Sequence, residues 1–216
     1  MRLRGMLETL GAALAPPLCW SCRGPAPARR PLCAACEARL PWLDPQVPLP
    51  DRSPLAAAWA PLSYEGVARD LVHALKFAGA AGVARGMARQ ACDALPPRAF
   101  PLSAALVPVP GDRARRRRRG FDHAEELAAA LAGLTGLEVR RPLVREHAHR
   151  SRQRGLGRSA RLAGAGIAVR ARDRSPASCL LVDDVMTTGA TARACAQALR
   201  DNGAVSVFFL AYCRVL

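Results

Sequence analysis

Residues 180–191, LLVDDVMTTGAT, join two adjacent carboxylates to a loop of threonine and glycine. Carboxylates repel anions, whereas free backbone N–H groups and hydroxyls at the start of a helix attract them. A ligand that suits both parts carries hydroxyl groups or a metal ion at one end and a phosphate at the other. A ribose 5-phosphate unit has this composition.

The pattern around this stretch predicts where it lies in the fold. An apolar strand is expected over residues 178–182, a helix over 192–199 and a further strand over 205–212. Asp183 and Asp184 then fall at the carboxyl end of a strand, where open α/β sheets bind their ligands. The stretch has neither the Walker A pattern nor the G-x-G-x-x-G dinucleotide fingerprint.

Four of the eight cysteines form two C-x-x-C pairs, at positions 19/22 and 33/36, with ten residues between the pairs. Each pair can present two thiolates to one metal ion, and this spacing lets both turns close into a tetrahedral site. Four thiolates favour zinc, with an iron–sulfur cluster as the alternative. Two redox-active pairs or disulfides are a further alternative. The other cysteines, which occupy apolar contexts, are expected to be core thiols: Cys92, Cys179, Cys195 and Cys213.

The chain is strongly basic, with a formal net charge of +15, and Lys76 is its only lysine. Codon bias and an anionic partner, either a phosphorylated small molecule or nucleic acid, explain the total equally well. Residues 113–119 hold six arginines in seven positions, and residues 150–161 form a second basic stretch. Glycines beside the first run, directly after an apolar strand, favour phosphate binding there. Lys76 is expected at the surface, with a phosphate contact as the alternative, and His123 is expected either at the surface or behind the residues that touch a ligand.

The remaining pattern predicts strands over residues 56–64, 102–110 and 166–169, and helices over 65–77 and 124–134. Five prolines in residues 41–54 indicate an extended linker and a boundary near residue 50. We therefore expect an N-terminal helix, a Cys₄ zinc finger and a Pro-rich linker in residues 1–50, and the main domain in 51–216. No apolar run is long enough for a membrane span, and residues 1–18 fit a short amphipathic helix better than a signal peptide. A cytoplasmic protein that is not integral to a membrane is expected.

Residues 180–192 resemble the 5-phosphoribosyl-1-pyrophosphate (PRPP) signature of type I phosphoribosyltransferases: a hydrophobic strand, two acids, then T-T-G-x-T. The whole chain is similar to the ComF family of competence-associated proteins, also called amidophosphoribosyltransferase-like. The resemblance rests on this signature, the cysteine pairs and four further segments: Leu75-Lys76-Phe77, Val107-Pro108-Val109-Pro110, Arg119-Gly120-Phe121 and Gln153-x-Gly155-Leu156. Where the family commonly has Gly-Phe-Asn-Gln, this chain has Gly120-Phe121-Asp122-His123.

The resemblance implies an α/β fold: a type I phosphoribosyltransferase-like parallel sheet flanked by helices, with a small N-terminal Cys₄ zinc finger. It implies that Asp183 and Asp184 are the catalytic residues, holding the ribose hydroxyls directly or through Mg²⁺. The implied 5-phosphate cradle comprises Met186, Thr187, Thr188, Gly189, Ala190 and Thr191. The implied pyrophosphate and hood loop includes Pro110, Gly111, Arg113, Arg119 and Gly120. The implied structural zinc ligands are Cys19, Cys22, Cys33 and Cys36.

Members of this family are linked to DNA uptake and natural transformation, or to the use of DNA as a nutrient. The resemblance therefore implies a protein that binds PRPP with Mg²⁺ and assists DNA uptake, with competence-machinery proteins as further partners. Three activities stay open: phosphoribosyl transfer to an unknown acceptor, sensing of PRPP or a nucleotide without turnover, and binding of single-stranded DNA. Aromatic residues that could stack on bases make up only 5% of the chain.

Overall fold

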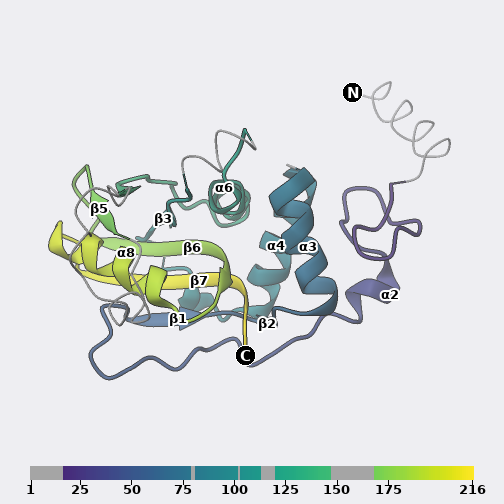
Figure 1. Cartoon of the computed structure of the whole chain (residues 1–216), viewed down its shortest axis with the longest axis horizontal. Helices are drawn as coiled ribbons and strands as arrows, with labels where there is room; N and C mark the ends of the chain where they lie inside the picture. The colour runs from purple at the N-terminus through teal and green to yellow at the C-terminus, as the bar shows by residue number, and fades with distance from the viewer. Residues whose placement is uncertain (1–16, 79–80, 102, 113–119, 147–167) are drawn as a thin grey trace, which may run out of the picture.

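The computed structural model describes residues 17–78, 81–101, 103–112, 120–146 and 168–216, and its centre is a parallel sheet (Figure 1). Strands β6 (Ser178–Met186) and β7 (Ser206–Arg214) pair along most of their length. The strand order is β1-β7-β6-β3, with β2 also paired to β7, and every one of these pairings is parallel. The flanking strands are β1 (Ala57–Trp59), β2 (Leu62–Ser63) and β3 (Ala105–Pro108).

Helices cover both faces of the sheet, as a parallel sheet requires. Leu180 and Val182 of β6 join one core cluster with α3, α4 and α6, while Cys179 and Leu181 join a second cluster with α8. This division follows from the alternation of side chains along a strand. The expected α/β fold, a parallel sheet flanked by helices, is confirmed. The helices are α2 (Ala34–Glu37), α3 (Gly66–Ala78), α4 (Ala81–Ala94), the 3₁₀ turn η1 (Pro97–Ala99), α6 (His123–Thr135) and α8 (Ala190–Asp201).

Several element boundaries differ from the sequence-based expectations. The strand expected over residues 178–182 continues to Met186, because pairing with β7 extends to Arg214. Helix α4 was not expected, although its buried Val83, Met87 and Ala91 recur at helical spacing. The short antiparallel pair β4 (Leu143–Arg145) and β5 (Val169–Ala171) packs beside α8. β4 was not expected, and the strand expected over residues 166–169 corresponds to β5, which ends two residues later. The expected N-terminal helix and both arginine-rich stretches lie outside the described residues.

The proline-rich segment of residues 41–54 is extended and attached to the sheet. Isolated bridges join Trp42 to Leu62 and Gln46 to Trp59, both antiparallel. Backbone hydrogen bonds run in both directions, from Leu43 N to Pro61 O and from Ala60 N to Pro45 O. Proline is tolerated at such an edge because the segment pairs with the sheet on one side only. On its other side a missing backbone N–H costs no hydrogen bond. The segment therefore protects this edge of the sheet from pairing with another chain.

The cysteine-bearing segment packs onto α4 and shares its core with the sheet domain. Leu32, Cys36 and Leu40 belong to the same buried cluster as Leu71 and Met87. A Cβ atom at Gly86 would lie 2.4 Å from Pro31 Cγ, so this close approach requires glycine. The boundary near residue 50 stays a prediction, but the apolar core does not end there.

A chain of buried polar groups joins the sheet, α4 and α2. The Tyr212 hydroxyl donates to Gln90 Oε1 at 2.7 Å, and Gln90 Nε2 donates to Glu37 Oε1 at 2.9 Å. Tyr212 is fully buried, and burial raises its pKa well above the usual range. The phenol therefore keeps its proton and remains the donor. Among the described residues, no helix is long and apolar enough to cross a membrane.

We expect Tyr212→Phe to lower the free energy of unfolding by about 1–3 kcal/mol, because it leaves a buried Gln90 acceptor without a donor. Urea denaturation followed by circular dichroism measures this. Tyr64→Phe is the matched control, since that hydroxyl lies 3.4 Å from His73 Nε2 at an exposed position. Equal losses in the two variants would contradict a special role for the buried chain.

Candidate functional site

The site lies where the connections after two neighbouring strands diverge. β3 and β6 are paired in parallel, so their carboxyl ends lie at the same end of the sheet. The chain leaving β3 enters α6 in one core cluster, whereas the chain leaving β6 enters α8 in the other. Such divergence opens a crevice beyond the strand ends, where α/β proteins bind ligands.

Asp183 and Asp184 lie near the carboxyl end of β6, three and two residues before its last residue, Met186. Their side chains start on opposite faces of β6. Asp184 N donates to Asp183 Oδ1 at 2.9 Å, which turns the first carboxylate back toward the second. The carboxylates of both residues and a ring nitrogen of His123 lie within 4.8 Å of one another. This group of donors could hold a divalent cation.

Lys76 and His123 approach Asp184 from the helices on its face of the sheet. The Asp184 side chain is 4% exposed, and its Oδ2 lies 2.8 Å from Lys76 Nζ. His123 Nε2 lies 3.6 Å from Asp184 Oδ1. Lys76 was expected at the surface, and His123 there or behind the residues that touch a ligand, but the ends of α3 and α6 bring them into the crevice. The sequence held a weak signal for each: Lys76 is the only lysine, and His123 is a departure from the family pattern.

Burial and the adjacent carboxylate act together on Asp183. Desolvation, followed by repulsion from Asp184, raises the pKa of Asp183 well above its usual range, with the Asp184 N–H and the Lys76 charge opposing the shift. Asp183 therefore gives up its proton less readily than an exposed aspartate does. Asp184 Oδ2 is also buried without a well-aligned hydrogen bond from any described residue.

The threonine and glycine loop lies between β6 and α8, at the N-terminus of the helix. Gly189 is the N-cap with φ of 69°, and a Cβ atom there would lie 2.8 Å from Met186 Cε. This left-handed conformation favours glycine. Thr188 Oγ1 accepts from Ala190 N at 3.3 Å, and Thr187 and Thr188 are exposed. The structure thus places residues 186–191 as the turn and the first helical residues.

Arg193 adds a positive charge to this loop that the sequence analysis missed. Its guanidinium donates to the Thr188 carbonyl at 3.0 Å, and a Cβ on Gly189 would be 3.1 Å from it. The sequence held one signal for Arg193. It lies one turn after the N-cap Gly189, and a helical side chain at that position reaches back toward the helix start.

The loop after β3 meets the start of α6 through Asp122. Asp122 caps the helix by accepting from Ala124 N at 3.0 Å, and its other oxygen accepts from Gly111 N at 3.2 Å. A Cβ at Gly111 would lie 2.4 Å from Asp122 Oδ2, so the contact requires glycine. A cavity of about 270 Å³ beside this loop includes Pro110, Gly111 and Arg145 in its lining. Gly120 is exposed with φ of 79°, and Arg113 and Arg119 lie outside the described residues.

The two cysteine pairs converge in the N-terminal segment that packs onto α4. One sulfur from each of Cys19, Cys22, Cys33 and Cys36 lies within 4.8 Å of the others. The Cys22 and Cys33 sulfurs are 3.7 Å apart, close to the roughly 3.8 Å edge of a tetrahedron with Zn–S bonds of about 2.3 Å. All eight cysteines are free, so this cluster could bind zinc. The other thiols are core residues as expected, although Cys92 is only partly buried.

Local hydrogen bonds prepare the cluster for a cation. Burial raises the pKa of Cys19, but backbone hydrogen bonds from Cys22, Cys33 and Ser21 lower it more, to about 6. Burial and the neighbouring sulfurs raise the pKa of Cys36 to about 12. The metal-free cluster therefore holds only part of the charge that four thiolates would have, and a dication would displace the remaining protons.

Comparison with known proteins gives two curated relatives that match nearly the full chain. The DNA utilization protein YhgH of Salmonella typhi is 32% identical, over 93% of this chain and 98% of the relative. Its counterpart from Salmonella typhimurium is 30% identical over the same shares. No family model matches the chain.

Solved structures resemble the chain more distantly. Glutamine PRPP amidotransferase from B. subtilis, complexed with ADP and GMP, is 18% identical with a TM-score of 0.40. The match covers 65% of this chain and 26% of that chain, so this chain corresponds to about a quarter of the enzyme.

We expect Asp183→Asn to be more stable than the native protein at neutral pH in magnesium-free buffer. An unfolded aspartic acid ionises near pH 4, whereas folded Asp183 keeps its proton to a higher pH. The folded state binds more protons between these two pKa values, so native stability falls as pH rises through that window. Asparagine cannot ionise, and its Oδ1 can still accept from Asp184 N.

The gain should grow as the pH rises above about 4, where the unfolded aspartate ionises, and it should vanish near pH 4. Urea denaturation of both proteins across this range tests it. Asp201→Asn, an exposed carboxylate on α8 bonded to Gln197, is the control and should show no such pH dependence. Lower stability of Asp183→Asn at neutral pH would contradict the assignment.

Proposed function

Because the chain belongs to the ComF family, together with the DNA utilization protein YhgH, we propose that it binds PRPP with Mg²⁺ and acts in DNA uptake. The observation that carries this proposal is the carboxyl end of β6, beside the end of β3, where the paired carboxylates directly precede the Thr/Gly start of α8. A site for an anion alone would not need the carboxylates, and a site for a cation alone would not need the helix start. A ribose that carries a phosphate uses each.

In this proposal the ribose hydroxyls donate to Asp183 and Asp184. The 5-phosphate lies against the free N–H groups of the first turn of α8, with Thr187, Thr188 and Thr191 as hydroxyl donors. Arg193 contributes a full positive charge beside that loop. The helix dipole and the arginine act on the same group, so the 5-phosphate end is the better defined half of the site.

The pyrophosphate would lie toward the loop of Pro110 and Gly111, which Asp122 holds against α6. The Lys76 ammonium partly neutralises Asp184, so the carboxylate pair repels the ligand less. The oxygen donors of Asp183 and Asp184, with His123 beside them, fit a divalent cation. When bound with PRPP, Mg²⁺ would stabilise negative charge on the pyrophosphate.

We propose phosphoribosyl transfer to an acceptor as the activity, with binding or sensing without turnover as the second candidate. Transfer would break the bond between C1 and pyrophosphate, and the acceptor would supply the new bond at C1. The donors that would steady the departing pyrophosphate include Lys76 and the Gly111 loop. Single-stranded DNA is the further partner that the family membership supports, together with competence-machinery proteins.

We further propose that the four-cysteine cluster binds structural zinc. Its sulfur spacing fits a tetrahedral ion, and Cys19 and Cys36 belong to the core that holds the segment against α4. Such a site requires free thiols, which fits a protein that works in the cytoplasm.

Isothermal titration calorimetry with PRPP and Mg²⁺ tests the central proposal. We expect saturable binding by the native protein and at least tenfold weaker binding by Asp183→Asn/Asp184→Asn. The neutral amides attract Mg²⁺ less strongly than carboxylates do, and each has one acceptor oxygen for the ribose hydroxyls where a carboxylate has two. Asp201→Asn, which removes an exposed carboxylate on α8, is the control and should bind normally. If binding is found, pyrophosphate release in an acceptor screen distinguishes turnover from sensing.

Ribose 5-phosphate and pyrophosphate, titrated separately, locate the two halves of the site. Absence of heat with millimolar PRPP, from protein shown to be folded and loaded with metal, would exclude PRPP as the ligand. Equal weakening in the control and the double variant would exclude the carboxylate pair as its site.

Metal analysis of the purified protein tests the cysteine cluster. We expect one zinc per chain, and loss of zinc with a lower melting temperature in Cys22→Ser, because three thiolates leave the tetrahedral site incomplete. Cys92→Ser is the control, since that sulfur lies outside the cluster. Iron with visible absorption in place of zinc would show that the cluster is iron–sulfur instead.

A further inference from the structure

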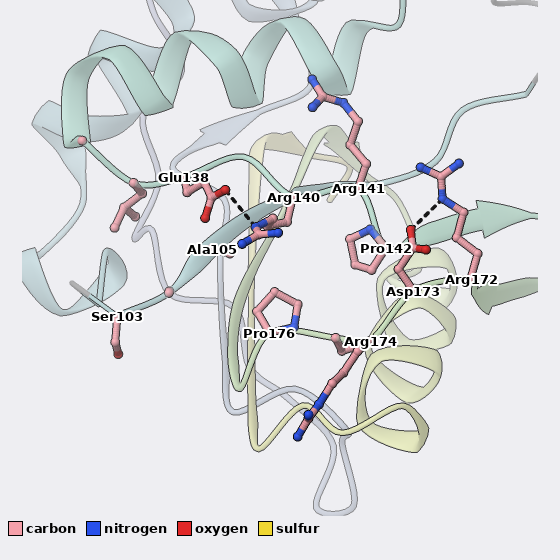
Figure 2. A pocket seen from close by; sticks show the side chains of 14 residues that line it. Ser103, Ala105, Glu138, Arg140, Arg141, Pro142, Arg172, Asp173, Arg174 and Pro176 are labelled. Carbon is pink, nitrogen blue, oxygen red and sulfur yellow. Dashed lines mark hydrogen bonds and ion pairs between the residues drawn. The ribbon is translucent and has the colours of Figure 1, made fainter.

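A second cavity lies at the opposite end of the sheet from Asp183 and Asp184. Its volume is about 600 Å³, and its lining includes Ala105 at the start of β3 and Pro176, two residues before β6 (Figure 2). Pro176 and Asp183 are separated by seven residues of mostly extended chain, which corresponds to about 20 Å. The cavity is therefore separate from the crevice to which PRPP is assigned, and it is large enough for a nucleotide-sized ligand.

The lining of this cavity is rich in arginine. Arg140, Arg141, Arg172 and Arg174 contribute to it, against two acidic residues, Glu138 and Asp173. Figure 2 shows Arg141 and Arg172 extending on one side of the view, Arg174 on the other, and Arg140 between them. The surplus of two positive charges is carried by guanidinium groups, whose fork of donors matches phosphate oxygens.

The acidic residues neutralise only part of this charge. Arg140 pairs with Glu138 and Arg172 with Asp173, each at 2.9 Å, and both pairs are exposed. Arg141 is 3.6 Å from Glu125, and no carboxylate among the described residues pairs with Arg174. Exposed pairs contribute little stability, so a phosphate can compete for these guanidiniums.

Ser175 adds a hydroxyl that has no hydrogen-bond partner among the described residues to the lining of this cavity. The residue is 6% exposed, and its Oγ is buried without a hydrogen-bond partner among the described residues. Its backbone N–H donates to Asn202 O at 3.2 Å, which fixes the residue in the wall. A buried hydroxyl without a partner is destabilising, and a ligand oxygen would remove that loss.

The lining also limits what the ligand can be. No aromatic side chain is present among the residues that line this cavity, so it offers no stacking platform for a base. Recognition must therefore come mainly from the phosphate. Arg141 and Arg172 also line the cavity beside Gly111, so the basic surface continues toward the other end of the sheet.

We propose that this cavity is a second phosphate-binding site, which takes the phosphate of a free nucleotide or of a nucleotide within a single strand. Arg140 and Arg174 bind the phosphate oxygens, and Ser175 donates to one of them. The site does not depend on the proposed PRPP function.

Titration with thymidine 5′-monophosphate and with a short single-stranded thymidine oligonucleotide, in low salt, tests this. We expect Arg140→Gln/Arg174→Gln to weaken binding at least tenfold. Arg52→Gln/Arg69→Gln removes the same charge from exposed positions outside this lining and should bind like the native protein. Ser175→Ala should weaken binding without lowering the melting temperature, because it deletes a hydroxyl that has no partner.

Weakened monophosphate binding supports a free nucleotide as the source, and weakening confined to the oligonucleotide supports a strand. Asp183→Asn/Asp184→Asn should bind the monophosphate at this cavity with unchanged affinity, which separates failure here from failure of the PRPP site. Equal losses in the two arginine variants, or no loss in either, would overturn the proposal.

Discussion

The parallel pairing of β3 with β6, together with their divergent connections, sets the geometry on which the rest of the molecule depends. Pairing in register from Ala105 to Pro108 puts both carboxyl ends at one end of the sheet. Because α6 and α8 belong to opposite cores, neither connection covers the strand ends. The loop of Gly111 and the loop of Gly189 therefore face one crevice. The same pairing leaves the amino ends of both strands beside the second, arginine-lined cavity.

Charge is balanced locally in the crevice, over a few ångströms. Asp184 is almost fully buried, and the Lys76 ammonium at 2.8 Å compensates its charge. Among the described residues no cation forms an ion pair with Asp183, and burial beside Asp184 raises its pKa. One carboxylate is thus fixed by an internal cation while the other is poised to respond to a ligand. This asymmetry explains how two adjacent acids can lie beside the Thr/Gly loop to which we assign the 5-phosphate.

The departure from the family pattern at positions 122 and 123 acquires a structural explanation. Asp122 accepts both the α6 cap hydrogen bond and the Gly111 N–H, so one side chain fixes the helix start and the loop together. His123, the next residue, is carried to 3.6 Å from Asp184. An asparagine could accept only through its single oxygen, so the loop would be held differently. The Asp122 carboxylate therefore joins the loop of Gly111 to the start of α6.

The sequence by itself determined the elements that depend on local pattern: the apolar strand that leads into two acids, the Thr/Gly helix start, the two C-x-x-C turns and most of the helices. Periodicity and loop chemistry are properties of neighbouring residues, so they can be interpreted before folding. Tertiary structure decided that Lys76 and His123 enter the crevice, that Gly86 admits Pro31, and that arginines separated in sequence line one cavity. It also decided that β6 reaches Met186, since its end depends on pairing with β7. Contacts between distant segments depend on how the helices and strands pack. The spacing of residues within one segment does not predict which other segment it will contact.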